Sequence, residues 1–290
     1  FTWVASVNAV LYLGAVPVLC DIDLDTYALC PMALERAITK RTKAIMPVHL
    51  FGGAAPMKII MEIAAQHELL VIEDAACALG TLIDGVHAGC IGDFGTFSFH
   101  PRKVITTGEG GMVIAAHQSG LETLKALRNH GITADGDVAH LGFNYRLSDV
   151  QGAIGVGQLE LLPRFLKDRN EQAKRYQSLL KDVPGLITPS VPTETTHAFQ
   201  AYVCRLTTGD AGRRDELMKH LATKGIQTRP GTHAVHRLEW HQSHLEFDAH
   251  KLTQSDIAHD QTLALPIFPG LSEAAQHHVT DELKQALNRS

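Results

Sequence analysis

The feature that most constrains the fold is an alternation of short apolar runs with helical segments between residues 16 and 130. Leu69–Glu73 (LLVIE) is a continuous apolar run, typical of a strand that is covered on both faces. The other elements expected in this region are strands at Val16–Ile22 and Ala44–Val48 and helices at Pro31–Lys40 and Pro56–His67. Strands joined by helices pair in parallel through right-handed crossovers. We therefore expect an α/β fold with a mainly parallel sheet.

The pattern continues with two more strands and two helices. The strands are expected at Asp93–His100, which Pro101 ends, and at Gly111–Ala115. Ser148 is suited to cap the first helix, with Gln151 completing a capping box. The second helix is expected from Arg164 to Val183.

A stretch rich in Pro, Thr and Ser, Leu186–Thr195, indicates a domain junction. The elements expected after it are strands at Ala201–Leu206 and Ile226–Thr228 and helices at Asp210–Thr223 and Glu273–Leu287. We therefore predict a large domain over residues 1–185 and a smaller α/β domain over residues 186–290.

Composition excludes several classes of protein. The formal net charge of −5 gives no support for a nucleic-acid or membrane-surface partner. The five cysteines are scattered, which favours a reducing compartment, and we expect a cytoplasmic protein. No charged residue precedes Asp21, but Thr2, Ser6, Asn8, Gly14 and Pro17 interrupt this apolar start. A buried helix followed by a buried strand therefore explains it better than a membrane span or a signal peptide.

Polar residues gather where the expected strands end. Asp74 follows the LLVIE strand, Ser98 lies near the end of the next one, and Lys103 follows in the loop before a glycine-rich stretch, TTGEGG. Ligands collect at the carboxyl ends of parallel strands. This set suggests Schiff-base chemistry, although Asp74 alone could cap a turn and Lys103 alone could be a surface charge.

Several blocks carry a resemblance that extends over nearly the whole chain: FTWVASVNAV, DIDLDTY, PVHLFGG, VIEDAACALG, SFHPRKVITTGEGGM, LGFNYRLSDVQGAIGVGQL and ALPIFP. The sequence resembles the DegT/DnrJ/EryC1/StrS group of sugar aminotransferases. This resemblance implies the type I, aspartate-aminotransferase-like fold and pyridoxal 5'-phosphate as cofactor.

The resemblance also implies roles for five residues. Lys103 matches the lysine that holds the cofactor as a Schiff base, and Asp74 matches the carboxylate that pairs with the pyridine nitrogen. Ser98 matches a phosphate ligand, and Trp3 an aromatic residue that stacks on the cofactor ring. Asn144 matches an asparagine that reaches the phosphate of the neighbouring subunit, which implies a homodimer.

The resemblance further implies transfer of an amino group from glutamate to a nucleotide-linked keto-sugar. Family members with histidine in place of Lys103 act as sugar dehydratases, so the lysine favours transamination. The ITTGEGG block is similar to branches that aminate the C4 ketone. Cys77 departs from the family, which commonly has His or Gln there, and a small, weakly polar thiol cannot make the same contact.

Other interpretations stay open. Arg229 or His233 could contact the substrate diphosphate, because arginine suits diphosphate geometry. A histidine run could bind zinc if helical, although a polar surface loop explains it as well and we predict no metal; it comprises His233, His236, His241, His244 and His250. A non-catalytic binding or regulatory protein on the same fold is the remaining alternative.

Family members have a further N-terminal segment with a Gly-Thr turn whose N–H groups hold the cofactor phosphate. No such turn precedes Phe1 in this sequence. We therefore expect a chain truncated at its N-terminus that binds cofactor poorly by itself.

Overall fold

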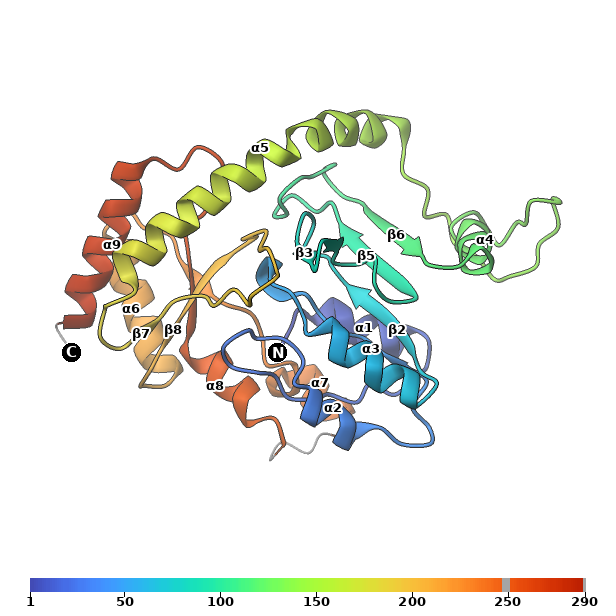
Figure 1. Ribbon diagram of the computed structural model, residues 1–290, viewed down its shortest axis with the longest axis horizontal. Helices are drawn as coiled ribbons and strands as arrows, with labels where there is room; N and C mark the ends of the chain where they lie inside the picture. The colour runs from blue at the N-terminus through green and yellow to red at the C-terminus, as the bar shows by residue number, and fades with distance from the viewer. Residues whose placement is uncertain (247–250, 289–290) are drawn as a thin grey trace.

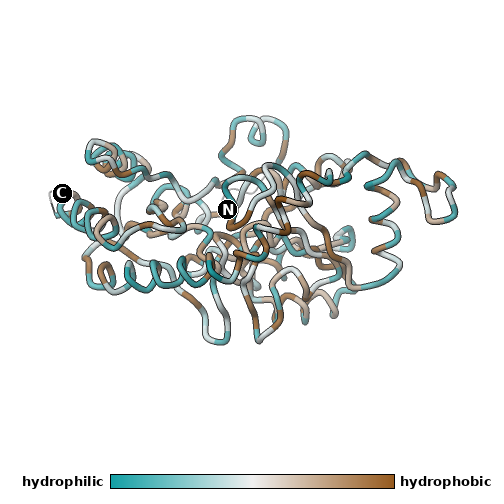
Figure 2. The backbone as a smooth tube through the Cα atoms, turned by 90° about the horizontal axis from the view of Figure 1, so that it is seen from above, coloured by the Kyte–Doolittle hydropathy of each residue, from teal (hydrophilic) through white to brown (hydrophobic). Residues whose placement is uncertain are grey.

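The computed structural model describes residues 1–246 and 251–288. Its strands form two four-stranded sheets and one two-stranded ribbon. Figure 1 shows the first sheet beside the N-terminal helices and the second beside the C-terminal helices, with the long helix α5 (Asp149–Leu180) passing along both. In Figure 2 the hydrophobic stretches gather toward the middle of the molecule, whereas the outer helices are mostly hydrophilic.

The first sheet has the strand order β1-β2-β5-β6. Its strands are β1 (Ala44–Ile45), β2 (Leu70–Asp74), β5 (Phe94–Ser98) and β6 (Gly111–Ala115). β1 and β5 both pair with β2 in parallel, and β6 pairs with β5 in the antiparallel sense. The α/β fold with a mainly parallel sheet is therefore confirmed. The carboxyl ends of β2 and β5 meet at one edge, since Asp74 is in register with Thr96.

The helix α3 (Met57–Gln66) covers this sheet because its apolar residues recur at helical spacing. Met57, Ile60 and Ile63 are buried and share a core cluster with Val71 of β2. The expected helix at residues 31–40 is the shorter α2 (Pro31–Ala37), which has Pro31 in its first turn. A ribbon of β3 (Leu82–Ile83) and β4 (Val86–His87) follows β2 along the chain.

The second sheet has the order β7-β8-β10-β9. Its strands are β7 (Leu186–Ile187), β8 (Tyr202–Leu206), β9 (Arg229–Pro230) and β10 (Thr262–Leu265). The helices α6 (Ala211–Thr223) and α9 (Glu273–Asn288) share its core with the C-terminal half of α5. Within this core, Tyr176 packs on Tyr202 and its hydroxyl donates to the Pro266 carbonyl oxygen at 2.9 Å.

Two helices were expected between residues 148 and 183, and this expectation is wrong: α5 is one helix of 32 residues. Pro163 lies inside it and removes the hydrogen bond to the carbonyl group of Leu159. Leu159 is exposed, so water can satisfy that carbonyl group. The capping box between Ser148 and Gln151 is confirmed.

The expected strand at Val16–Ile22 is also wrong. This segment is irregular, and its single ladder contact is the bridge between Ile22 and Leu29. Val16 and Val18 are exposed because, in the described part of the chain, no neighbouring strand pairs with them. The preceding helix α1 (Val4–Tyr12) was expected to be buried, but only Val7 of it is.

The strand expected at Ile226–Thr228 lies slightly later in the chain. It is β9, whose position is set by pairing with β10, where Arg229 is opposite Ala264. The sequence analysis missed β10, whose four residues are all buried. It also missed the helices α4 (Gln118–Leu127), α7 (Glu239–His244) and α8 (Thr253–Gln261). No helix among the described residues is long and apolar enough to cross a membrane.

Buried contacts join the two sheets. Tyr27 and Phe51 from the first part of the chain share a core cluster with Val203 of β8 and Ala258 of α8. The buried carboxylate of Asp21 accepts hydrogen bonds from the backbone N–H groups at the start of α8 and from the Ser255 hydroxyl group at 2.7 Å. The division into domains 1–185 and 186–290 stays a prediction.

Candidate active site

Asp74 ends β2 at the carboxyl edge of the first sheet. Its Oδ1 accepts the Ala76 N–H at 3.1 Å, and its Oδ2 accepts the Ser6 hydroxyl group of α1 at 2.6 Å. Two donors therefore orient the carboxylate. Sequence reasoning missed Ser6, whose only signal was its place in the FTWVASVNAV block.

Lys103 lies in the loop after β5, where its N–H group donates to the His100 carbonyl oxygen at 2.9 Å. Its ammonium nitrogen lies 3.1 Å from the sulfur of Cys77. Because Cys77 follows Asp74 by three residues, this contact brings the lysine to the turn that holds the carboxylate. The structure thus brings Lys103 and Asp74 to the same edge of the sheet. Sequence reasoning missed the contact between Lys103 and Cys77.

Ser98 is the last residue of β5, the strand beside β2. Its hydroxyl oxygen accepts the His100 N–H at 3.3 Å, which leaves the hydroxyl proton available to donate to a ligand. The glycine-rich loop that follows is held by α5: Gln158 accepts from the Thr106 N–H, and Gln151 donates to the Glu109 carbonyl oxygen. Ser98 therefore belongs to the same edge as Asp74.

Beneath this edge lies a buried pair, His49 and Glu73, both with fully covered side chains. The Nδ1 of His49 accepts the Ala55 N–H, so the Nε2 carries the proton and donates to Glu73 at 2.9 Å. Glu73 also accepts the backbone N–H groups of residues 89, 91 and 92 at 2.7–2.8 Å. Burial alone would raise the pKa of Glu73, but these hydrogen bonds together lower it. These contacts fix the position of Glu73, which directly precedes Asp74 in the chain.

Trp3 precedes α1, is 58% exposed and lies against a residue of the C-terminal part of the chain. Its ring centroid is 5.4 Å from that of His233, and the Thr2 N–H donates to the His233 carbonyl oxygen at 3.0 Å. The helix that carries Ser6, the partner of Asp74, thus begins at Trp3. His233 therefore lies beside one of the residues expected to contact the cofactor.

Arg229 also lies near the edge that carries Lys103. Burial lowers the pKa of its guanidinium group, the positive charge of Arg102 lowers it further, and Cys77 raises it. The Arg102 carbonyl oxygen accepts a hydrogen bond from Gln200 at 2.9 Å, which holds this part of the loop. The positive charges of Arg229 and Arg102 act on one another, and this favours an anionic ligand near Arg229.

Asn144 is placed apart from these residues within one chain. It lies in the segment between α4 and α5, which projects from the body of the molecule in Figure 1, and it pairs with Asn129. Within the described part of the chain, no hydrogen bond joins it to Asp74, Ser98 or Lys103.

The histidine run does not converge. His236 pairs with Asp256 at 2.9 Å, His233 lies against Trp3, and His244 stacks on Trp240. Among residues 1–246 and 251–288, no three His, Cys, Asp or Glu side chains are arranged to hold a metal ion. His250 lies outside the described residues.

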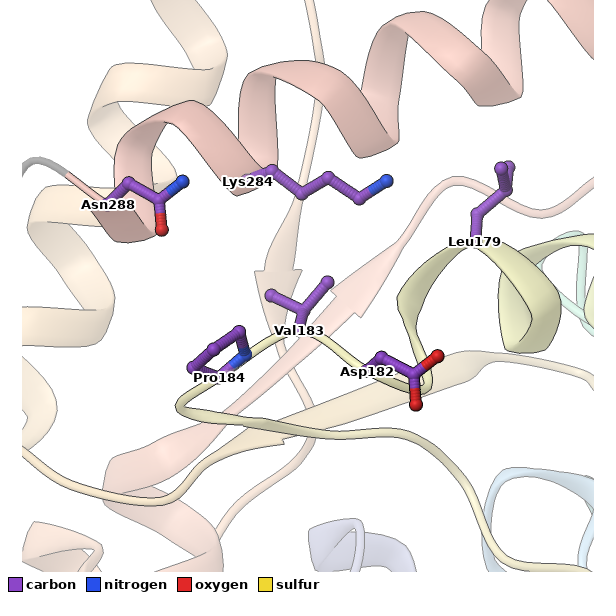
Figure 3. Close-up of a pocket in the computed structure, with 6 residues that line it drawn as sticks. All are labelled: Leu179, Asp182, Val183, Pro184, Lys284 and Asn288. Atoms are coloured by element: carbon purple, nitrogen blue, oxygen red, sulfur yellow. The ribbon is translucent and has the colours of Figure 1, made fainter.

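A pocket lies away from the candidate residues, between the C-terminal end of α5 and α9 (Figure 3). It is lined by Leu179, Asp182, Val183, Pro184, Lys284 and Asn288. None of the residues at the edge of the first sheet contributes to it.

Comparison with known proteins identifies the family of this chain. The chain matches the DegT/DnrJ/EryC1/StrS aminotransferase family over residues 1–284. It belongs to this family, and it is therefore a pyridoxal-phosphate-dependent aminotransferase of the type I fold.

Two curated relatives are similar along almost the whole chain. A GDP-perosamine synthase of Caulobacter vibrioides is 40% identical over 289 residues, which cover 99% of this chain and 77% of the relative. A GDP-perosamine synthase of Escherichia coli O157:H7 is 35% identical, with 98% of this chain and 76% of the relative covered.

Among solved structures, DesV of S. venezuelae, in complex with a ketimine intermediate, superimposes with a TM-score of 0.92 at 33% identity. The match covers 100% of this chain and 77% of that one. An aminotransferase, TlmJ, from Streptoalloteichus hindustanus gives a TM-score of 0.91 at 30% identity, covering 99% and 77% of the two chains.

The residues at the sheet edge fit pyridoxal phosphate. The cofactor aldehyde forms a Schiff base with an amine, and Lys103 supplies that amine. The Lys103 nitrogen is hydrogen-bonded to Cys77, which is a weak acceptor, and not to a carboxylate. A protonated pyridine nitrogen requires a carboxylate, which Asp74 presents with both oxygens already oriented. A phosphate requires donors, and Ser98 has a free hydroxyl proton. The donor set thus matches the three polar parts of the cofactor.

Proposed function

We propose that this protein transfers an amino group from L-glutamate to the C4 keto group of a nucleotide-linked deoxysugar, in the biosynthesis of an amino sugar. The observation that carries the proposal is the meeting of Lys103, Asp74 and Ser98 at the carboxyl edge of one sheet. The two relatives named GDP-perosamine synthase support a nucleotide-sugar substrate. The ITTGEGG block supports the C4 position.

Each residue has a role in this proposal. Pyridoxal phosphate, when bound, supplies an electron sink for the carbanion that forms at the Cα of the amino acid. Lys103 would hold the cofactor through its aldehyde, and its amine would move the proton between the Cα of the amino acid and the cofactor carbon. Asp74 would accept a hydrogen bond from the protonated pyridine nitrogen and stabilise its positive charge, with the Ser6 hydroxyl group fixing the carboxylate. Ser98 donates to the phosphate.

Two further residues contact the ligands in this proposal, and two others support them. Trp3 covers one face of the cofactor ring, with His233 supporting its indole ring. Arg229 binds the substrate diphosphate, because its planar fork of donors matches phosphate oxygens. The positive charge of Arg102 nearby strengthens the attraction for that anion.

We further propose that the active form is a homodimer in which Asn144 reaches the neighbouring site. An apolar face supports this, made by the segment at residues 138–147 and the N-terminal half of α5. Its exposed side chains are Val138, Leu141, Phe143, Tyr145, Leu147, Val150, Ile154, Val156 and Leu159. A monomer rarely exposes so many large apolar side chains in one region, and a second copy would cover those that it contacts.

The assignment of Lys103 is tested by absorbance spectroscopy of the purified full-length protein with added pyridoxal phosphate. The wild type is expected to develop the Schiff-base absorbance band, and Lys103→Ala to lack both the band and transamination. Lys125→Ala, at an exposed position of α4, is the control and keeps both. A band that persists in Lys103→Ala contradicts the assignment.

The reaction is tested with glutamate and a panel of 4-keto and 3-keto sugar nucleotides. Formation of 2-oxoglutarate together with a 4-amino sugar is the expected result. A bound sugar nucleotide without 2-oxoglutarate would indicate a binding protein, and a dehydrated sugar would indicate a dehydratase. A 3-amino product would contradict the proposed position of amination.

A further inference from the structure

Cys77 is the residue at the site that the proposed reaction leaves without a role. Its sulfur lies 3.1 Å from the Lys103 nitrogen, and its side chain is partly exposed. The thiol therefore has a positive group at hydrogen-bond distance and access from solvent.

The other cysteines lie in different surroundings. Burial raises the pKa of Cys20 to about 11, and it also raises the pKa of Cys204. The pKa of Cys90 is raised by desolvation and by the negative charge of Glu73. All five cysteines are described, and Cys77 is the one with a hydrogen bond to a charged nitrogen. Reactive thiols are those close to cations and open to solvent, so the setting of Cys77 differs from that of Cys90.

We propose that Cys77 and Lys103 form an oxidisable pair, in which peroxide converts Cys77 to a sulfenic acid and Lys103 captures it as a sulfenamide. The reacting atoms are already at hydrogen-bond distance, so no rearrangement of the backbone is needed to join them. The product occupies the nitrogen that the cofactor requires, so oxidation prevents cofactor binding until a thiol reductant restores the pair.

The steps balance in atoms and electrons. The Cys77 thiolate attacks one oxygen of hydrogen peroxide, the O–O bond breaks, and sulfenic acid and hydroxide form. Hydroxide takes a proton from the Lys103 ammonium group and becomes water. The free amine then attacks the sulfur, the S–O bond breaks, and a second water leaves as the S–N bond forms. The sulfur loses two electrons and the peroxide gains them, so no other oxidant is needed.

The proposed pair rests on the proposed function in one respect. The cofactor must bind Lys103, and this binding protects the lysine from the cross-link. Cofactor-bound protein is then resistant to the cross-link, whereas the form with a free lysine is sensitive. Peroxide would therefore cross-link the protein molecules in which Lys103 is not bound to cofactor.

The test treats cofactor-free and cofactor-loaded protein with hydrogen peroxide and maps peptides by mass spectrometry. In the cofactor-free protein we expect the peptides of Cys77 and Lys103 to be joined with a loss of two hydrogen atoms, and dithiothreitol to separate them. Cys77→Ser and Lys103→Arg are expected to abolish the cross-link, whereas the control Cys90→Ser keeps it. Cofactor-loaded protein is expected to lack it.

A cross-link that is absent from the cofactor-free protein, although peroxide oxidises other cysteines, overturns the proposal. Oxidation of Cys77 that stops at sulfinic acid also overturns it, because Lys103 would then not have captured the sulfur. Failure of the proposed function gives a different result: the cross-link forms in the free protein, but added pyridoxal phosphate does not protect Lys103.

Discussion

Among single residues, Glu73 shows how the chain prepares its site. A fully buried carboxylate is costly unless it is hydrogen-bonded, and Glu73 accepts bonds from His49 and from three backbone N–H groups. Those N–H groups belong to the loop after the β3–β4 ribbon, so the side chain ties that loop to the end of β2. The position of Asp74, one residue further on, depends on this tie.

We expect Glu73→Gln to destabilise the protein by about 1–3 kcal/mol, because the amide would place N–H donors against backbone donors in a buried site. Denaturant unfolding of the two proteins measures the difference. Glu62→Gln, at an exposed position of α3, is the control and is expected to change stability by less than about 0.5 kcal/mol. Equal stability of Glu73→Gln and wild type would show that the carboxylate is not required.

The same residue predicts a pH dependence. Because the folded-state pKa of Glu73 is lowered, its stabilising contribution is complete above the unfolded pKa, about 4.3, and is lost as the pH falls through the folded value. The difference in unfolding free energy between wild type and Glu73→Gln should therefore shrink as the pH falls below about 4. A difference that stays constant between neutral and acidic pH would contradict this.

The positions of some residues of the candidate site could be predicted from the sequence, but their contacts could not. Asp74, Ser98 and Lys103 could be located because strand ends in a parallel sheet converge, whatever the rest of the chain does. The partner of each could not be predicted: Ser6 reaches Asp74 from 68 residues away, and Cys77 reaches Lys103 across 26. Such contacts depend on how separate elements pack, which local pattern does not contain.

Among the elements, α5 shows which features of a helix the local sequence predicts and which it does not. Its start was predicted from Ser148 and Gln151, since a capping box is a local hydrogen-bond pattern. Its continuity through Pro163 was not predicted. An interior proline costs a helix one hydrogen bond and crowds the carbonyl group four residues earlier. Exposure of that carbonyl group to water reduces the first cost, and exposure is set by the tertiary structure.

Removing the cap should loosen this helix locally. We expect Ser148→Ala to cost about 1 kcal/mol and to speed hydrogen exchange in the first turn of α5, while the buried C-terminal half stays protected. Ser178→Ala, on an exposed part of the same helix, is the matched control. Unchanged exchange at residues 149–152 in Ser148→Ala would show that the capping box does not hold this end.

For the whole molecule, the proposed dimer makes a prediction about the apolar face of α5. A charge on a side chain that the second copy covers would remain exposed in the monomer but would lose its water in the dimer. We therefore expect Val156→Asp to lower the molar mass measured by light scattering from that of two chains to that of one. Val191→Asp, at an exposed position outside this face, is expected to leave the mass unchanged.

A mass of one chain for the wild type would contradict the dimer. A mass of two chains for Val156→Asp, with Val191→Asp unchanged as well, would place the interface on another surface. Neither outcome bears on the assignment of Lys103, which the absorbance test decides independently.

The sequence by itself determined the α/β class, the helices with strong apolar periodicity and the strand ends that carry Asp74, Ser98 and Lys103. These depend on local pattern and on the convergence of parallel strands. Only the tertiary structure decided that Val16–Ile22 is not a strand, that α5 is unbroken, and that Cys77 meets Lys103. A strand needs a neighbour to pair with, and a contact between distant residues needs both elements in place; neither is a property of a short stretch of chain.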